Sequence, residues 1–171
     1  MGDSAMIVVA IFLAAILMFV FPLMIMADKK DDVSTLNVKT ATTEFTDTIR
    51  TTGKITQEAY DNYVQTLAAT GNSYDVEIKV QVLDENPAKK ETSQTAVIGD
   101  NVYFEMYTTQ ILDAIKMGDL ILKEGDIVSV SAENTNVTIG MQLRNFLYKV
   151  TGNNSTSIAA SASGIVTTNG Q

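Results

Sequence analysis

The chain has 171 residues, a length typical of one domain or of one domain with an appendage. It contains no cysteine and no histidine, which excludes disulfides and every metal site or catalytic arrangement that needs a thiolate or an imidazole. Its 20 acidic and 12 basic residues give a net charge of −8. This charge argues against nucleic acid and anionic lipid headgroups as direct partners, because their phosphates would be repelled.

The first predicted element is a membrane-spanning helix. From Ala5 to Ala27 the sequence contains no charged residue, and about 20 apolar residues are enough to cross a hydrocarbon core of about 30 Å. The segment is apolar on every side, whereas a soluble helix has one apolar face. The leader carries no Lys or Arg and residues 24–28 form a poor cleavage site, so we favour an uncleaved anchor over a removed secretory signal. The expected partner of this segment is the lipid bilayer.

Three residues in this segment are candidates for helix packing and bending. Ala10 and Ala14 form a small-xxx-small step, which would let a second helix approach closely. Pro22 lacks a backbone donor and is expected to bend the helix near Met18, four residues earlier. Alanine and proline are also common in membrane helices that have neither role.

The orientation of the chain rests on two opposing signals. Lys29 and Lys30 follow the apolar segment, and the positive-inside rule applied to them would place the rest of the chain in the cytoplasm. The rest of the chain is acidic, rich in Thr, Ser and Asn, and free of cysteine, which suits an exported surface. We expect the remainder to face the outside of the cell, with the cytoplasmic orientation as the alternative.

An amphipathic helix is predicted to continue directly from the apolar segment. Its apolar positions recur every three to four residues, and no Gly or Pro occurs from residue 23 until Gly53. These positions are Val33, Leu36, Val38, Ala41, Thr42, Phe45 and Ile49. We therefore expect a transmembrane anchor (1–27) and a helical stalk (28–52) that form one rod of roughly 45 residues, about 70 Å long.

The head domain (53–171) is predicted to begin with a helix and a strand. Thr56 is placed to cap a helix whose apolar face contains Tyr63 and Leu67, and Gly71 is placed to end it. From residue 74 to residue 83 apolar residues alternate with polar ones, which predicts a half-buried strand.

Further elements are predicted along the rest of the head. They are a polar loop (84–90), a short strand (96–98), a helix over 103–115 capped near Asp100, a hairpin of strands 120–122 and 127–130, a helix from Thr138 to Gly152, and a strand over 157–166. The order of elements predicts an α+β fold. In full, we expect an N-terminal transmembrane helix continuing into a long stalk helix, then a small head with a mainly antiparallel sheet and two or three helices.

Carboxylates are the groups that remain for catalysis. Those in predicted loops are Asp84, Glu85, Asp100, Asp119, Glu124 and Asp126. A retaining glycosidase needs two of them about 5 Å apart, but acidic loop residues usually face solvent. We therefore predict no catalytic residue, no cofactor, no metal and no small-molecule substrate.

Two short patterns have a more ordinary interpretation than a site. Asp84-Glu85-Asn86 and Gly125-Asp126 offer oxygen ligands for calcium but do not follow the calcium-loop pattern, which favours surface turns. Asn136 and Asn154 begin N-glycosylation patterns, which are short enough to occur by chance in a chain rich in Asn, Ser and Thr.

The plan of an N-terminal apolar span, a helical stalk and a small α+β head resembles that of type IV pilin-like proteins. The residues that carry a closer likeness are Phe45-Thr-Asp-Thr-Ile-Arg50, Gly53-Lys-Ile-Thr56, Tyr60, Leu67, Gly71, Val76-Glu-Ile-Lys-Val80, Gly125-Asp126-Ile-Val-Ser-Val130 and Ser163-Gly164-Ile-Val166. They resemble the bacterial tight-adherence (Tad) minor pseudopilins of the TadE type, over about the first 80 residues and more loosely beyond. The chain departs from the pilin pattern at Gly2, which has no basic leader, and at Ile7, where pilins carry Glu.

The resemblance implies a non-enzymatic, membrane-anchored structural subunit of a surface filament or secretion assembly. Its expected partners are the bilayer and other copies or related pilin-like subunits, which would pack through the N-terminal helix. Its expected location is the membrane or a surface filament, with the head outside. The alternatives are a membrane-tethered extracellular binding module and, less favoured, a carboxylate-dependent hydrolase of cell-wall glycans.

Overall fold

The computed structural model describes residues 2–83, 103–148 and 157–171. The expected loop 84–90, the strand 96–98, the cap near Asp100 and the helix end at Gly152 lie outside these residues. The described elements are α1 (Gly2–Thr52), β1 (Lys54–Ile55), α2 (Gln57–Ala68), β2 (Tyr74–Leu83), β3 (Tyr103–Tyr107), α3 (Thr108–Met117), β4 (Leu120–Ile121), β5 (Ile127–Asn134), α4 (Ile139–Tyr148) and β6 (Ala159–Ile165).

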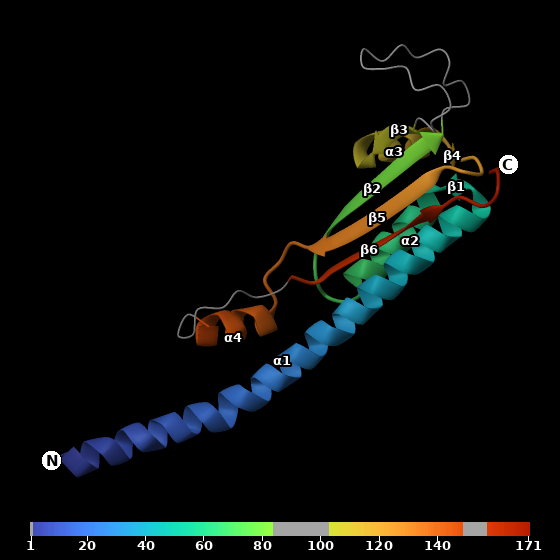
Figure 1. The fold of residues 1–171 in the computed structure, drawn as a ribbon. Coiled ribbons are helices and arrows are strands. Elements are labelled where there is room, and N and C mark those ends of the chain that lie inside the picture. Colours follow the sequence, from blue (N-terminus) through green and yellow to red (C-terminus); the bar gives the residue numbers. More distant parts are fainter. Residues whose placement is uncertain (1, 84–102, 149–156) are drawn as a thin grey trace, which may run out of the picture.

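The fold is α+β, as predicted, with a long helix that is apolar in its N-terminal part and a small head. The head contains a four-stranded antiparallel sheet of order β3-β2-β5-β6 and, in the described residues, the helices α2, α3 and α4. α1 and α2 lie along one face of the sheet (Figure 1). α3 runs beside β2, where the Thr108 hydroxyl accepts a hydrogen bond from the Ile78 amide at 2.8 Å. α4 lies apart from the sheet, beside α1 at the base of the head (Figure 1).

Helix α1 is a single element of 51 residues, about 75 Å long. Its C-terminal part carries a buried stripe at intervals of three and four residues, the spacing that puts side chains on one helical face. The stripe consists of Asp31, Ser34, Val38, Ala41, Thr42, Phe45, Thr46 and Ile49. The expected apolar face is therefore confirmed from Val38 onward. It is wrong at Val33 and Leu36, which are exposed because the buried stripe continues toward the N-terminus through the polar Ser34 and Asp31.

The contact between α1 and α2 combines stacking with a buried polar bond. The rings of Phe45 and Tyr63 stack with centroids 4.6 Å apart, and the Tyr63 hydroxyl lies 2.8 Å from the Thr42 hydroxyl. The Thr42 hydroxyl also donates to the Val38 carbonyl at 2.7 Å. Threonine hydroxyls that bond one turn back in this way are tolerated inside a core because no polar group is left unpaired.

Strand β6 lets α1 approach the sheet closely because its inward side chains are small. Ala160 is partly buried against the core, and Gly164 faces Arg50, where an added β-carbon would collide with the guanidinium stem. The Arg50 Nε donates to the Ile165 carbonyl at 3.0 Å. The long helix and the last strand of the chain are thereby held together.

The predictions for the first helix and strand of the head are confirmed. The Thr56 side chain caps α2 by accepting a hydrogen bond from the Ala59 amide at 3.1 Å. Gly71 follows the end of α2 with a φ of +80°, and β2 covers residues 74–83 with Ile78 and Val80 in the core. The expected C-terminal strand is confirmed as β6, and α4 begins after Thr138 as predicted.

The predicted helix over 103–115 is wrong in its first part. Residues 103–107 form the edge strand β3, and helix α3 begins at Thr108. β3 pairs with β2 in the register Lys79↔Tyr107 to Leu83↔Tyr103. The aromatic side chains of this segment suit a strand, and the exposed edge of β2 supplies the backbone partners.

The predicted hairpin of 120–122 and 127–130 is also wrong. β4 pairs with β1, far away in the sequence, whereas β5 pairs with β2 and β6. The turn between β4 and β5 does form, and Asp126 holds it: its carboxylate accepts from the amides of Lys123 and Leu83, both at 2.8 Å. Leu122 instead bonds the Gly53 carbonyl, which draws β4 toward the end of α1.

Replacing Gly53 should destabilise the head more than replacing Gly71. Both have positive φ, but a β-carbon at Gly53 would collide with the backbone of Thr168 and Gly170, whereas a β-carbon at Gly71 would meet no atom within 4 Å beyond its chain neighbours. We expect Gly71→Ala to cost about 1 kcal/mol and Gly53→Ala about 3 kcal/mol or more. Thermal unfolding of the full chain in detergent measures both, and equal losses would contradict the crowding at Gly53.

Candidate functional site: the apolar part of helix α1 and the base of the head

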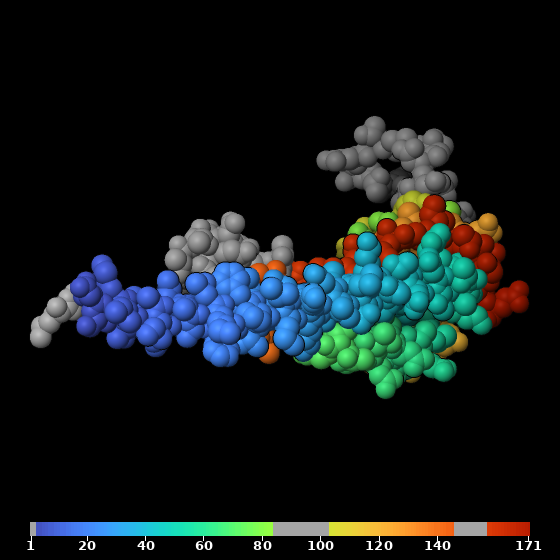
Figure 2. Space-filling view, turned by 90° about the horizontal axis from the view of Figure 1, so that it is seen from below, coloured from blue at the N-terminus to red at the C-terminus, as the bar shows by residue number. Residues whose placement is uncertain are grey.

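The N-terminal part of α1 exposes apolar side chains on every side. Its exposed large residues are Met6, Ile7, Val8, Val9, Ile11, Phe12, Leu13, Ile16, Leu17, Met18, Phe19, Phe21, Leu23, Ile25 and Met26. Figure 2 shows this part of the helix, in dark blue, extending away from the head. Among the described residues, α1 is the one helix that is long and apolar enough to span a membrane. An exposed apolar surface of this extent marks a contact with lipid or protein.

The three residues predicted for packing and bending lie on this surface. Ala10 and Ala14 are exposed, one turn apart, and so are accessible to a second helix. Pro22 is exposed inside the continuous helix, where it cannot donate to the Met18 carbonyl. Figure 1 shows α1 changing direction between its dark-blue N-terminal part and the part that lies along the sheet. The role of the two alanines in packing stays a prediction.

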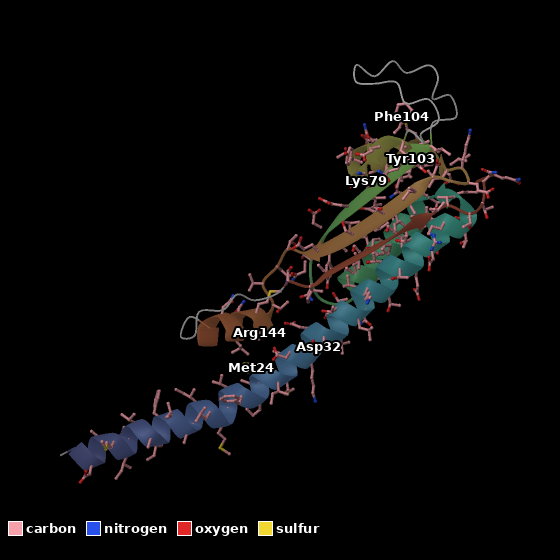
Figure 3. All side chains as sticks on the ribbon, viewed as in Figure 1. Met24, Asp32, Lys79, Tyr103, Phe104 and Arg144 are labelled. Atoms are coloured by element: carbon pink, nitrogen blue, oxygen red, sulfur yellow. The ribbon has the colours of Figure 1, made fainter. Side chains whose placement is uncertain are left out.

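A network of charged residues joins the base of the head to α1 just beyond the apolar segment. The Asp31 side chain is 10% exposed, and its Oδ2 accepts from the Thr138 hydroxyl at 2.8 Å and from Arg144 at 3.3 Å. The same Arg144 nitrogen lies 3.0 Å from the Asp28 carboxylate. Figure 3 shows Arg144 on the side of α4 that faces α1. The network therefore positions α4 against α1, and we call it the basal ion network.

The start of α4 is built to fit against this network. The Thr138 hydroxyl, which donates to Asp31, also accepts from the Met141 amide at 3.1 Å and so caps the helix. Gly140 faces the Asp31 carboxylate so closely that an added β-carbon would collide with it. Sequence reasoning missed this site. The available signal was Asp31 itself, which lies in helical phase with Ser34, Val38 and Ala41.

The face of the sheet opposite α1 and α2 is polar and is not covered by any described helix. Cross-strand rows run over it: Glu77 lies beside Ser131 and Ser161, and Lys79 lies beside Ser129 and Ser163. Two shallow recesses of about 380 Å³ and 350 Å³ lie along these rows. We call this surface the open sheet face. Its rows of hydroxyls and charges offer hydrogen bonds to a polar ligand.

An ion pair with added hydrogen bonds lies at the β3 edge of this face. Glu105 accepts from Lys79 at 2.6 Å, from the Tyr107 hydroxyl at 2.5 Å and from Gln81 at 3.0 Å. These bonds favour the ionised carboxylate, with Lys79 the strongest cause, and lower the pKa of Glu105 to about 2. The Glu105 carboxylate raises the pKa of both Lys79 and Tyr107 above their ordinary values.

The loop carboxylates considered for catalysis or calcium are not brought together in the described residues. Asp126 is buried and both its oxygens accept backbone amides, which accounts for it as a structural residue of the turn. Asp119 and Glu124 are exposed. Asp84, Glu85 and Asp100 lie outside the described residues, and within those residues no group of three acidic side chains forms a possible metal site.

Of the two N-glycosylation patterns, the one at Asn136 lies within the residues that the structure describes. The Asn136 side chain accepts from the Ser73 amide at 2.8 Å and donates to the Asn72 side chain at 3.2 Å. These bonds join the loop before α4 to the turn after α2, which gives Asn136 a structural role. Asn154 lies outside the described residues.

Comparisons of this chain with known protein families, curated proteins and solved structures find no match.

Removing Asp31 should loosen α4 without unfolding the sheet. Asp31→Ala leaves Thr138 and Arg144 without a shared acceptor in a partly buried site. We expect hydrogen exchange of the α4 amides to accelerate by about tenfold or more. Asp32→Ala is the matched control, because Asp32 is exposed on the adjacent position. Unchanged exchange in Asp31→Ala would show that the basal ion network does not hold α4.

The Glu105 cluster predicts a specific titration. Because the folded pKa is about 2, below the ordinary value of 4.5, the cluster's contribution to stability is present above pH 4.5 and is lost as the pH falls through about 2. NMR titration of the Glu105 carboxylate carbon should show this low pKa. Lys79→Met should raise it toward 4.5, and Lys116→Met, at a separate exposed ion pair, should leave it unchanged.

Proposed function

We propose that this chain is a non-enzymatic, membrane-anchored structural subunit of a surface filament or secretion assembly, with the plan of a pilin-like protein. One observation carries the proposal. A single helix of 51 residues exposes apolar side chains on all sides in its N-terminal part and contributes a buried stripe to the core of the head in its C-terminal part. This arrangement supports a subunit that is anchored through its N-terminal helix. The helix would lie in lipid and pack against other helices.

The absence of a linker within α1 favours assembly over simple tethering. A module that only needs to stay near a membrane is served by a flexible connection. Here the helix continues from the apolar segment through Asp31 and into the core at Val38. The position of the head therefore follows the position of the span, which is what a subunit packed through its span requires.

The proposal places the apolar segment across a bilayer and the head outside the cell. Most of the net acidic charge belongs to the head, and the segment from Ala5 to Ala27 has no charged residue. Ala10 and Ala14 would then face a second helix within the membrane, where small residues allow close backbone approach. Pro22 would let the span bend as it packs.

A membrane-tethered binding module is the second candidate, and the open sheet face favours it. That face presents serine hydroxyls beside Glu77 and Lys79 with two shallow recesses. The binding-module hypothesis predicts that the head binds its ligand equally well when the apolar segments of different copies do not assemble.

Disulfide cross-linking tests the assembly proposal, since the chain has no cysteine of its own. Leu17→Cys places a reporter on the face that contains Ala10 and Ala14. We expect oxidation of membranes to link copies of this variant. Adding Ala10→Leu and Ala14→Leu should reduce the linked fraction by about tenfold, for a loss of roughly 1.4 kcal/mol of helix packing.

The control for this experiment adds Val8→Leu and Ile11→Leu to the same reporter, which keeps the apolar character and leaves the two alanines in place. Cell fractionation should show all three variants in the membrane. A chain that remains a monomer in membranes, without links to itself or to other proteins, would rule out the structural subunit. Retained ligand binding by that monomer would support the tethered module.

A further inference from the structure

Two exposed apolar side chains lie at the base of the head, next to the apolar segment of α1. Val137 and Ile139, at the start of α4, are 57% and 66% exposed. They share one recess of about 510 Å³ with Leu23 and Met26 of the apolar segment, which are 56% and 68% exposed. The apolar surface of α1 thus extends onto the start of α4 at the base of the head.

The depth of this surface relative to α1 is determined by close contacts. The Thr138 hydroxyl bonds Asp31 at 2.8 Å, and a β-carbon on Gly140 would lie 3.5 Å from the Ala27 carbonyl. Residue 140 therefore lies beside Ala27, the last residue of the apolar segment. Leu23 is one helical turn before Ala27, about 6 Å along the axis. Leu23, Met26, Val137 and Ile139 therefore lie at a similar depth along α1 and line the same recess.

Polar groups line the same recess beyond the apolar residues. They are Lys30 and Asp31, which follow the apolar segment on α1, and Asn72, Asn136 and Thr138 of the head. A surface with apolar side chains toward the span and polar ones toward the head matches the gradient of a membrane interface, where an apolar face is buried to a depth of about 5–10 Å.

We propose that the base of the head, formed by Val137, Ile139 and the start of α4, is a second membrane contact that enters the interfacial layer of the bilayer. This inference rests on the proposed membrane anchoring of α1. The bilayer is the occupant because the surface is continuous with the exposed apolar segment. The basal ion network of Asp28, Asp31 and Arg144 locks α4 to α1. The contact therefore sets the tilt of the sheet relative to the membrane.

Site-specific fluorescence quenching tests this contact in the full chain. Single-cysteine variants Val137→Cys and Ile139→Cys are labelled with an environment-sensitive dye and reconstituted in phosphatidylcholine vesicles. Leu13→Cys serves as the standard for the span, and Ser161→Cys on the open sheet face serves as the control for the head. We expect spin-labelled lipid to lower the fluorescence at positions 137, 139 and 13 by about twofold or more and to leave position 161 unchanged. Thermal unfolding of each variant checks that the head is intact.

Each other outcome overturns the inference in a distinct way. If lipid quenches position 13 while aqueous iodide quenches 137 and 139, the base of the head lies in water and the anchoring by α1 stands. If neither reagent reaches 137 and 139, protein covers them, and a second copy takes the place of lipid. If lipid does not quench position 13, the membrane anchoring fails and the interfacial contact fails with it.

Discussion

The continuity of helix α1 is the constraint on which the rest of the structure depends. The same hydrogen-bonded helix that exposes apolar side chains from Met6 to Met26 turns one face toward the head, toward α4 at Asp31 and toward the core from Val38 onward. Because the two parts belong to one helix without a linker, the orientation of the head is coupled to that of the apolar segment. Figure 1 shows α1 changing direction along its length, and the helix contains Pro22, where one backbone donor is missing.

Helix α1 is rich in threonine, and close packing of small and polar residues allows it to contribute to the core of the head. Strand β6 brings Ala160 and Gly164 under α1, so the helix approaches the sheet closely. The buried threonines of α1 cost little because their hydroxyls bond carbonyls one turn back, as Thr46 does to Thr42 at 2.8 Å. A threonine-rich helix with low intrinsic propensity is thereby stabilised by tertiary contacts.

The molecule presents two surfaces of opposite character, and the basal ion network lies at their boundary. Below it are the apolar segment and the apolar start of α4, and above it is an acidic head with an open sheet face of serines and charges. Arg144 contacts both Asp28 and Asp31, which places a cluster of two carboxylates and one guanidinium where the apolar surface ends. The proposed assembly through the apolar segment and the alternative, recognition through the open sheet face, are compatible because the two surfaces do not share residues.

Local patterns in the sequence were enough to predict the long helix, the Thr56 cap, strand β2 and the α+β class, since each depends on periodicity or capping within a few residues. The strand at residues 103–107 and the pairing of β4 with β1 were predicted wrongly, because their backbone partners lie far away in the chain. The basal ion network went unpredicted for the same reason: Asp31 and Arg144 are 113 residues apart. Periodicity identifies which residues of a helix face inward, but the partner that each inward residue meets depends on how distant segments pack.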